Sequence, residues 1–329
     1  MDDIARLANV SKPTVSRALR DSPNVLPDTK KRVLEVAKKY GYAVNRNAQK
    51  LRHKRLDTIA VVLDFPSLHE KRISDPFIFE LLGGVAEALA VREQDLLLCS
   101  PHLDDAGSYR TILSSKGADG LVFLGQGRRE AALRELAEAG APFVVWGAVT
   151  DDAPYCVVGS DNHLGGMLAG RHIASRDRRR VLFIGDTAHM EIKLRRDGLV
   201  AALDEDAPGY SIADIAIGDF AYDTSFAAVS SFIAQAADLP DAVFACSDSC
   251  AMATINAFRE AGLNAPEDIS VVGYNDIPEG AHFFPPLTTI RQDVHMAGSL
   301  LVERLMQALD GSTARSIKLN TELVVRGSS

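Results

Sequence analysis

The sequence predicts a small all-α helix-turn-helix head followed by an α/β core of two lobes, each built on a doubly wound parallel sheet. Three observations point to this fold class. Two short helical patterns around a tight turn open the chain, the charge changes sign near residue 55, and apolar runs alternate with helical stretches behind that point. We expect the head at residues 1–44, a hinge helix or linker at 45–56, and the core at 57–329.

The turn between the first two helices contains a residue that suits it. Asn9 is of a type that, almost alone among non-glycine residues, readily adopts the left-handed backbone of a tight turn. Ser11 is a good N-cap for the second helix, and Pro13 falls in its first turn, where a missing amide proton costs little. The apolar side chains that can face inward are Ile4, Ala8, Val15 and Leu19.

The other side chains of the second helix are polar and basic. They are Lys12, Thr14, Ser16, Arg17 and Arg20, at its outer face or leading end. Short polar and arginine side chains are the types that meet base edges in the major groove of DNA. Many short amphipathic helix pairs share this layout, so the pattern favours DNA binding without proving it.

Charge is divided unevenly along the chain. Residues 1–55 hold 14 Lys and Arg against 5 Asp and Glu, a net charge of +9, whereas the whole chain has 36 against 44. Residues 56–329 therefore carry a net charge of −17. A basic head on an acidic body is typical of a nucleic-acid binder whose larger part has a second task.

A third helix is expected over residues 27–40, with Gly41 as its C-cap. Its apolar stripe consists of Val33, Val36, Ala37 and Tyr40. In the segment that follows, Ala48 and Leu51 lie three residues apart on one helical face, a stripe too weak to hold a helix unaided. That segment could fold when two copies of the chain meet on DNA.

From Ile4 to Leu51 the chain resembles the DNA-binding head and hinge of the LacI/GalR family of repressors. The motifs that carry the resemblance are Val10-Ser11, Thr14-Val15-Ser16-Arg17, Gly41-Tyr42 and Ala48 to Leu51. The resemblance continues to Thr321–Arg326, so it covers nearly the whole chain. It implies a periplasmic-binding-protein-like core that binds an effector between its lobes.

The resemblance also implies which residues touch double-stranded operator DNA. They are Lys12, Pro13, Thr14, Ser16, Arg17, Asn24, Asn45, Ala48 and Leu51. Leu51 would be the wedge in the minor groove, where the cost of unstacking is recovered through wider contacts with bent DNA. Two departures from the family stand out. Leu26 stands where a capping serine is common, and the family usually has a few residues before the position of Asp2, so a truncated or misassigned start is expected.

Apolar runs alternate with helical stretches throughout the core. Strands are expected at 58–63, 95–99, 120–124, 143–146, 181–184, 212–217, 242–246 and 269–272, and helices at 79–91, 129–139, 164–173, 194–203 and 251–261. This alternation indicates buried parallel strands in sheets covered on both faces. Eight strands are too many for one compact hydrophobic core, which indicates two lobes. We expect an N-lobe of about 57–156 and 289–319 and a C-lobe of about 157–288 and 320–329. Ligands of such folds bind beyond the carboxyl ends of strands, here between the lobes.

No pattern for catalysis or for a cofactor stands out. Gly83-Gly84 and Gly165-Gly166 lack the spacing of a phosphate loop. Cys246 and Cys250 have neither a second cysteine pair nor a histidine partner, so no metal site is expected. With four cysteines and no signal or membrane stretch, the chain is expected to be cytoplasmic, at the nucleoid, and reduced. We therefore expect neither enzyme activity nor a cofactor.

Polar and aromatic residues gather after the expected strands, as a sugar site requires. Aromatic faces pack on the C–H surface of a sugar, while charged and amide side chains bind its hydroxyls. From these positions and from the family resemblance together, the effector-binding residues that we expect are Phe77, Trp146, Asp161, Arg195, Phe220, Ser247, Asn275 and Gln292. A lone Trp or Phe is more often a core residue, and Asn275-Asp276 could be an ordinary turn. The segment 66–75 could lie at the cleft mouth or be a solvated insertion.

The family resemblance weighs in favour of the ligand site. Arg195 matches the arginine that grips the effector, and Phe220 matches an aromatic residue that stacks on it. Asp161, Ser247, Asn275 and Gln292 match further effector positions. Asn275 departs from the family, because the best-studied sugar and purine binders carry Asp there, and Ser247 replaces a longer amide or acid.

The expected function is a DNA-binding transcriptional regulator, a repressor whose operator affinity is controlled by a small molecule, above all a sugar. A homodimer would place one head on each half of a palindromic operator. The chain ends without leucine heptads, which favours a dimer over a dimer of dimers. Two alternatives stay open: a repressor of the same fold that responds to a purine or another metabolite, and a stand-alone sugar-binding module, which would not need the basic head.

Overall fold

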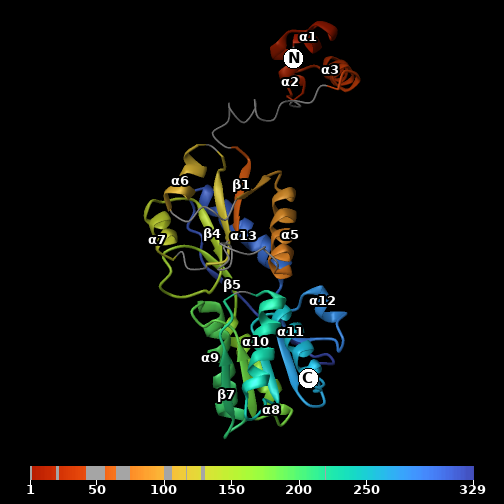
Figure 1. Ribbon diagram of the computed structural model, residues 1–329. Helices are drawn as coiled ribbons and strands as arrows, with labels where there is room; N and C mark the ends of the chain where they lie inside the picture. The colour runs from red at the N-terminus through yellow and green to blue at the C-terminus, as the bar shows by residue number, and fades with distance from the viewer. Residues whose placement is uncertain are drawn as a thin grey trace. The chain divides into compact units, whose positions relative to one another are not determined.

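The computed structural model describes residues 2–19, 22–41, 56–63, 75–99, 106–115, 117–126, 130–218 and 220–329. The chain forms two compact units, Met1–Leu56 and Asp57–Ser329 (Figure 1). The hinge residues Asn45, Ala48 and Leu51 and most of the segment 66–75 lie outside the described residues. None of the helices in the described part combines the length and the apolar character that crossing a bilayer demands.

The head unit contains three helices within its described residues: α1 (Asp2–Leu7), α2 (Lys12–Ala18) and α3 (Pro27–Lys39). Asn9 has a φ of 48°, which confirms the left-handed turn. Ser11 caps α2 by accepting a hydrogen bond from the Thr14 amide at 3.3 Å. Leu26 makes no side-chain cap to α3, so this helix begins with the weaker cap that the sequence predicts.

The head has a small apolar core of its own. Ile4, Ala8, Val15 and Val33 are buried in it, and Leu19 and Val36 pack against it. Tyr40 does not join the stripe, because α3 ends at Lys39 and the Tyr40 side chain is 57% exposed. The ring instead lies 5.9 Å from the ammonium group of Lys39.

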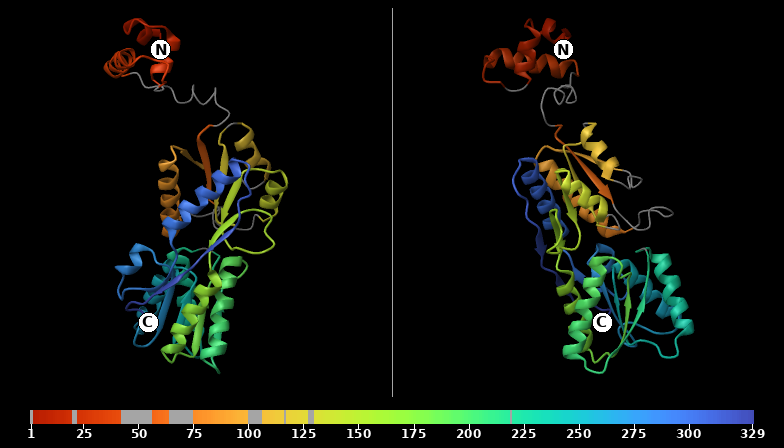
Figure 2. Two further views of the ribbon diagram at one scale, coloured as in Figure 1. Left: turned by 180° about the vertical axis from the view of Figure 1, so that it is seen from behind. Right: turned by 90° about the vertical axis from the view of Figure 1, so that its left-hand side faces the viewer.

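The first lobe of the core is built on a parallel sheet. Among the described residues this sheet has six strands in the order β11-β5-β4-β3-β1-β2. They are β1 (Thr58–Leu63), β2 (Asp95–Cys99), β3 (Gly120–Leu124), β4 (Phe143–Trp146), β5 (Val157–Ser160) and β11 (Ile317–Leu319). Helices α5 (Pro76–Val91) and α13 (Val294–Leu309) cover one face, and α6 (Ala106–Ser114) and α7 (Glu130–Glu138) cover the other (Figures 1 and 2).

The second lobe repeats this plan with one antiparallel strand. Its sheet, over the described residues, has the order β12-β10-β9-β8-β6-β7, and only β12 runs antiparallel. The strands are β6 (Arg180–Ile184), β7 (Ser211–Ile215), β8 (Ala242–Ala245), β9 (Ser270–Asn275), β10 (Thr288–Arg291) and β12 (Glu322–Val324). The helices are α8 (Asn162–Ser175), α9 (Met190–Asp206), α10 (Tyr222–Gln235), α11 (Asp248–Glu260) and α12 (Pro278–Ala281).

The chain passes between the lobes at slightly different points from those expected. β5 pairs with β4 in the first sheet, so the first crossover follows Ser160 rather than residue 156. β10 pairs with β9 in the second sheet, so the return follows Arg291 rather than residue 288. The third crossover joins β11 to β12. The first and third are bonded to each other, since the Asp161 amide donates to the Leu319 carbonyl at 2.7 Å.

Two strands that the sequence predicts as buried lie at sheet edges instead. In β2, Leu97 and Leu98 are 39% and 49% exposed, and most of β7 is open to solvent as well. An apolar run does not distinguish a central strand from an edge strand that another surface could cover.

Candidate functional site

A cavity that is open to solvent lies between the two lobes of the core, and its free space of about 630 Å³ includes the solvent at its mouth. The first lobe lines it with Asp75, Phe77, Ile78, Gly125, Gln126 and Trp146. The second lobe lines it with His189, Glu191, Ile192, Arg195, Phe220, Cys246, Ser247 and Asn275. Most of these residues follow the carboxyl end of a strand or begin the next helix, which is where parallel sheets place their ligand sites.

Aromatic rings line the cavity from both lobes. Phe77, in the first turn of α5, and Trp146, at the end of β4, have ring centroids 6.2 Å apart and planes tilted by 46°. Phe220 contributes a half-buried ring from the second lobe. A flat ligand with apolar faces can therefore contact aromatic side chains of both lobes.

Arg195 is the most firmly held polar group of the cavity. Its side chain is 8% exposed; Nε donates to Asn162 Oδ1 at 2.8 Å and Nη1 donates to the Cys246 carbonyl at 2.6 Å. The guanidinium group also stacks 3.6 Å above the ring centroid of Tyr274. These three contacts fix the plane of a group that has five N–H donors. Arg195 is therefore preorganised to bind a ligand oxygen.

His189 presents a buried nitrogen that lacks a hydrogen bond. The residue follows β6, precedes α9 and is 8% exposed. Within the part of the chain that the structure describes, Nε2 has no hydrogen-bond partner; the nearest carboxylate oxygen that forms an ion-pair contact, Asp186 Oδ2, is 3.9 Å away. Because an unpaired buried polar atom is costly, a polar ligand atom that reaches this nitrogen would gain affinity.

Asp75 places a carboxyl group at the cavity wall of the first lobe. It is the N-cap of α5 and accepts a hydrogen bond from the Phe77 amide at 3.1 Å. Burial raises the pKa of Asp75 to about 6, although the Phe77 amide and the positive charge of Arg195 both lower it. The carboxyl group therefore changes its charge near neutral pH while it faces an arginine of the other lobe.

Asn275 reaches the cavity through an unusual turn. It ends β9 with a φ of 119°, and Asp276 follows with a φ of 61°. Asn275 Oδ1 accepts a hydrogen bond from Gln292 Nε2 at 2.8 Å. Asp276 is held by Arg291 at 2.7 Å and by Arg326 at 2.6 Å. Two charged contacts thus fix the turn, which is not an ordinary one.

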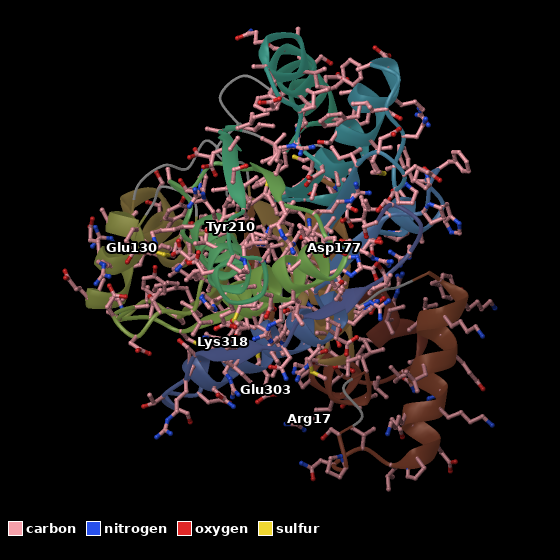
Figure 3. The ribbon with its side chains drawn as sticks, turned by 90° about the horizontal axis from the view of Figure 1, so that it is seen from below. Arg17, Glu130, Asp177, Tyr210, Glu303 and Lys318 are labelled. Atoms are coloured by element: carbon pink, nitrogen blue, oxygen red, sulfur yellow. The ribbon has the colours of Figure 1, made fainter. Side chains whose placement is uncertain are left out.

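The structure brings together six of the eight expected effector residues. Those that line the cavity are Phe77, Trp146, Arg195, Phe220, Ser247 and Asn275. Asp161 instead caps α8 by accepting from the Leu164 amide at 3.0 Å, and its carboxylate lies 3.8 Å from Lys318, which is labelled in Figure 3. Gln292 does not line the cavity but donates a hydrogen bond to Asn275, which does. Both Asp161 and Gln292 belong to segments that cross between the lobes.

Sequence reasoning missed Asp75, Gln126, His189, Glu191 and Cys246 among the cavity residues. Gln126 follows β3, and His189 and Glu191 follow β6, so the rule that ligands bind beyond strand ends would have found these three. Asp75 fell within a segment that we expected either at the cleft mouth or as a solvated insertion. Cys246 was considered only as a metal ligand, and no group of three or more metal-binding side chains occurs in the described part of the chain.

In the head, the expected DNA-contacting residues form the outer surface of α2. Lys12, Pro13 and Arg17 are exposed or half-buried, and Arg17 is labelled in Figure 3. Thr14 Oγ1 lies 2.8 Å from Ser11 Oγ, and Lys12 forms an ion pair with Asp2. Ser16 is half-buried, and Asn24 is exposed in the loop before α3. This arrangement leaves a polar and basic surface of the type that meets DNA.

Comparisons with known proteins agree with both units. Residues 1–45 match the model of "Bacterial regulatory proteins, lacI family", and residues 171–329 match a periplasmic binding protein-like domain. The chain is 31% identical to the HTH-type transcriptional regulator CelR of Thermobifida fusca, over 100% of this chain and 97% of the relative. It is 30% identical to the HTH-type transcriptional repressor PurR of Photobacterium profundum, over 99% of this chain and 97% of the relative.

Solved structures agree with this grouping. A CelR–cellobiose complex superposes with a TM-score of 0.73 at 30% identity and covers 99% of this chain and 98% of its own. A lac repressor dimer bound to operator has a TM-score of 0.83 at 23% identity, covering 99% of this chain and 97% of its own, which shows the shared fold. The expected fold class, a helix-turn-helix head with two α/β lobes, is confirmed.

Proposed function

Because this chain belongs to the LacI family of bacterial transcriptional regulators, we propose that it is a repressor whose affinity for operator DNA is controlled by a saccharide bound between its lobes. The observation that carries the proposal is the composition of the cavity. Aromatic rings contributed by both lobes border it together with a fixed arginine, an amide and a buried histidine nitrogen that no described residue hydrogen-bonds. Ring faces suit the C–H surface of a sugar, and the polar groups suit its hydroxyls.

The similarity to CelR, which has been solved with cellobiose, supports a sugar of this kind. The two hydrogen bonds and the stacking contact of Arg195 leave its guanidinium group fixed at the cavity wall. A neutral disaccharide would use Arg195 and Asp75 for its hydroxyls and would pack against Trp146. A purine is the second candidate, because PurR is about as similar in sequence as CelR.

The proposed binding of operator DNA depends on residues of α2 and of the hinge. Lys12, Pro13, Thr14, Ser16 and Arg17 would lie at the major groove with Asn24 beside them, and Asn45, Ala48 and Leu51 would act in the hinge on double-stranded operator DNA. Each head would read one half of a palindromic site, since a two-fold protein requires a two-fold site.

The core offers an apolar face for a second copy of the chain. Phe79 on α5 is 48% exposed, and the neighbouring edge strand β2 exposes Leu97 and Leu98. Large exposed apolar side chains next to an open strand edge are typical of association surfaces. We therefore propose that α5 and β2 take part in a homodimer.

The test uses the intrinsic fluorescence of Trp146, which is the only tryptophan of the chain and lines the cavity. The full-length protein is titrated with cellobiose, other disaccharides, monosaccharides, sugar phosphates, hypoxanthine and guanine. We expect a saturable change with a saccharide. Arg195→Ala should weaken that binding by about 10- to 100-fold, which is the effect of losing a charged hydrogen bond in a buried site.

Arg196→Ala is the matched control, because the neighbouring Arg196 pairs with Asp214 at the surface and does not line the cavity. It should bind the saccharide as the natural protein does. Saturation by hypoxanthine or guanine alone would replace the saccharide with a purine. Equal affinities of the Arg195→Ala and Arg196→Ala proteins would contradict the assigned site.

A further inference from the structure

Two buried cysteine thiols lie together, and one of them, that of Cys246, lines the cavity. Cys246 follows β8 and lines the cavity, and Cys250 lies in the first turn of α11. Their sulfur atoms are 4.0 Å apart, and the Cys246 S–H donates to the sulfur of Cys250. Both side chains are fully buried. Neither proposed ligand recognition nor DNA binding makes use of this pair.

The surroundings of Cys250 favour a negative charge on its sulfur. Ser225 Oγ lies 3.1 Å from the sulfur. The position in the first turn of α11 adds the positive end of the helix dipole. The hydrogen bond from Cys246 is the main cause that lowers the pKa of the Cys250 thiol; burial opposes it, and Ser225 and Ser247 add to the lowering. The same contact and burial raise the pKa of the Cys246 thiol. The pair thus combines a nucleophilic sulfur with a protonated neighbour.

We propose that Cys246 and Cys250 form a redox-sensitive dithiol, which a hydroperoxide entering the cavity converts into a disulfide. The Cys250 thiolate attacks the peroxide oxygen, the O–O bond breaks, and the alkoxide or hydroxide that leaves takes a proton from solvent. This step produces a sulfenic acid on Cys250. The Cys246 sulfur then attacks Cys250, the S–O bond breaks, and the departing hydroxide takes the Cys246 proton to form water. The two thiols lose two electrons and the peroxide gains them.

Bond formation requires movement at the effector site. A disulfide bond is about 2.05 Å long, so the two sulfurs must approach each other by about 2 Å. The Cys246 carbonyl holds Arg195 Nη1 at 2.6 Å, and Ser247, which caps α11, stands directly after Cys246. Displacement of this segment therefore shifts the anchor of the arginine that we place at the ligand. The device adds control by oxidants to control by a ligand, and it does not depend on the ligand being a saccharide.

The test exposes the full-length protein, without ligand, to a small excess of hydrogen peroxide. Intact-mass measurement should show the loss of two hydrogen atoms, and thiol titration of the unfolded protein should fall from the four cysteines present to two. Peptide mapping without reductant should link residues 246 and 250. Trp146 fluorescence should change in parallel, since this ring lines the same cavity, and a dithiol reductant should restore it.

Cys250→Ala and Cys250→Ser should both abolish the mass loss and the fluorescence change; two variants guard against a folding defect in either one. Cys99→Ala and Cys156→Ala remove the other two buried thiols and should leave the reaction intact. A gain of oxygen without loss of hydrogen, or a disulfide through Cys99 or Cys156, would overturn the proposal. So would a linked pair that leaves Trp146 fluorescence unchanged, because the pair would then not act on the cavity.

Discussion

At the scale of single residues, the groups that face one another across the cavity have opposite charge. Asp75 caps α5 in the first lobe, and Arg195 is anchored in the second lobe by Asn162 and by the Cys246 carbonyl. The raised pKa of Asp75, about 6, shows that burial outweighs the attraction of that arginine. The carboxyl group is therefore partly protonated just below neutral pH, where it can donate a hydrogen bond as well as accept one.

This shift predicts a pH-dependent stability. The folded state binds the Asp75 proton more tightly than the unfolded state, whose pKa is near 3.8, so stability falls as pH rises from about 4 to about 6. Asp75→Asn keeps a capping side chain and mimics the protonated form. The variant should match the natural protein near pH 4 and exceed it by about 1–3 kcal/mol above pH 7. Unfolding in denaturant at both pH values measures the difference. A difference that does not change with pH would contradict this role of Asp75.

The sequence allowed the aromatic side chains of the cavity to be predicted, but of its polar side chains only Arg195, Ser247 and Asn275, which match a known family. His189 and Asp75 were missed for physical reasons. In sequence, a histidine between a strand and a helix cannot be distinguished from a solvated residue. Only the structure shows that His189 is buried and that its Nε2 has no hydrogen-bond partner among the described residues. Asp161 and Gln292 follow strands too, yet they lie in the crossover segments, where proximity to the cavity depends on how the lobes meet.

At the scale of elements, α8 and α9 pack through glycines. A Cβ atom on Gly166 would lie 2.0 Å from the Arg195 carbonyl oxygen, and one on Gly198 would lie 2.0 Å from the His163 carbonyl oxygen. The backbones therefore approach too closely for any other residue. In the sequence, Gly166 was considered only in excluding a phosphate loop, since a glycine pattern does not reveal which helix will pack on it.

Gly166→Ala should separate the two helices and move Arg195. Overpacking of this kind costs about 1–3 kcal/mol or more, so the melting temperature should drop by several degrees. Ligand binding should weaken beyond the loss of stability, because the clash is with the backbone of Arg195 itself. Gly83→Ala is the control for adding a methyl group to a helix, because within the single chain the added Cβ would meet no described neighbour within 4 Å, so this variant should be as stable or slightly more stable. Since Gly83 lies on α5, which is part of the proposed dimer surface, the dimeric state of this variant is measured as well. Equal melting temperatures of the two variants would contradict the packing argument.

Central strands such as β1, β3 and β4 and helices such as α5, α8 and α9 were predictable from apolar periodicity, whereas α10 and α13 were not among the helices expected from the sequence. The position of β2 and β7 at exposed sheet edges was not predictable, because an edge strand in a large protein can be as apolar as a central strand. The short strands β10, β11 and β12 exist only through pairing with partners far away in the sequence. Their local patterns are too short to be distinguished from loops.

At the scale of the whole molecule, the two lobes of the core are joined by three crossover segments that lie after β5, after β10 and after β11. The first and third are tied together, since Asp161 donates through its amide to Leu319 and accepts through its carbonyl from the Thr321 hydroxyl at 3.3 Å. Short bonded crossovers permit the lobes to change their relative position while each sheet stays intact. A ligand that contacts both lobes favours one such position, and this preference is the free energy available for regulation.

Such a mechanism makes a reciprocal prediction. If a saccharide lowers operator affinity by some factor, operator DNA must lower saccharide affinity by the same factor, typically about 5- to 150-fold. The saccharide dissociation constant is measured by Trp146 fluorescence in the full-length protein, alone and saturated with a palindromic operator duplex. Operator affinity is measured by fluorescence anisotropy of labelled DNA, with and without saturating saccharide.

Arg17→Ala should weaken operator binding because it removes a cation from the outer face of α2, and it should leave saccharide affinity in the absence of DNA unchanged. A factor of one in both directions would mean that the ligand and the DNA do not bias one shared equilibrium between lobe positions, and the cavity would then not be the regulatory site.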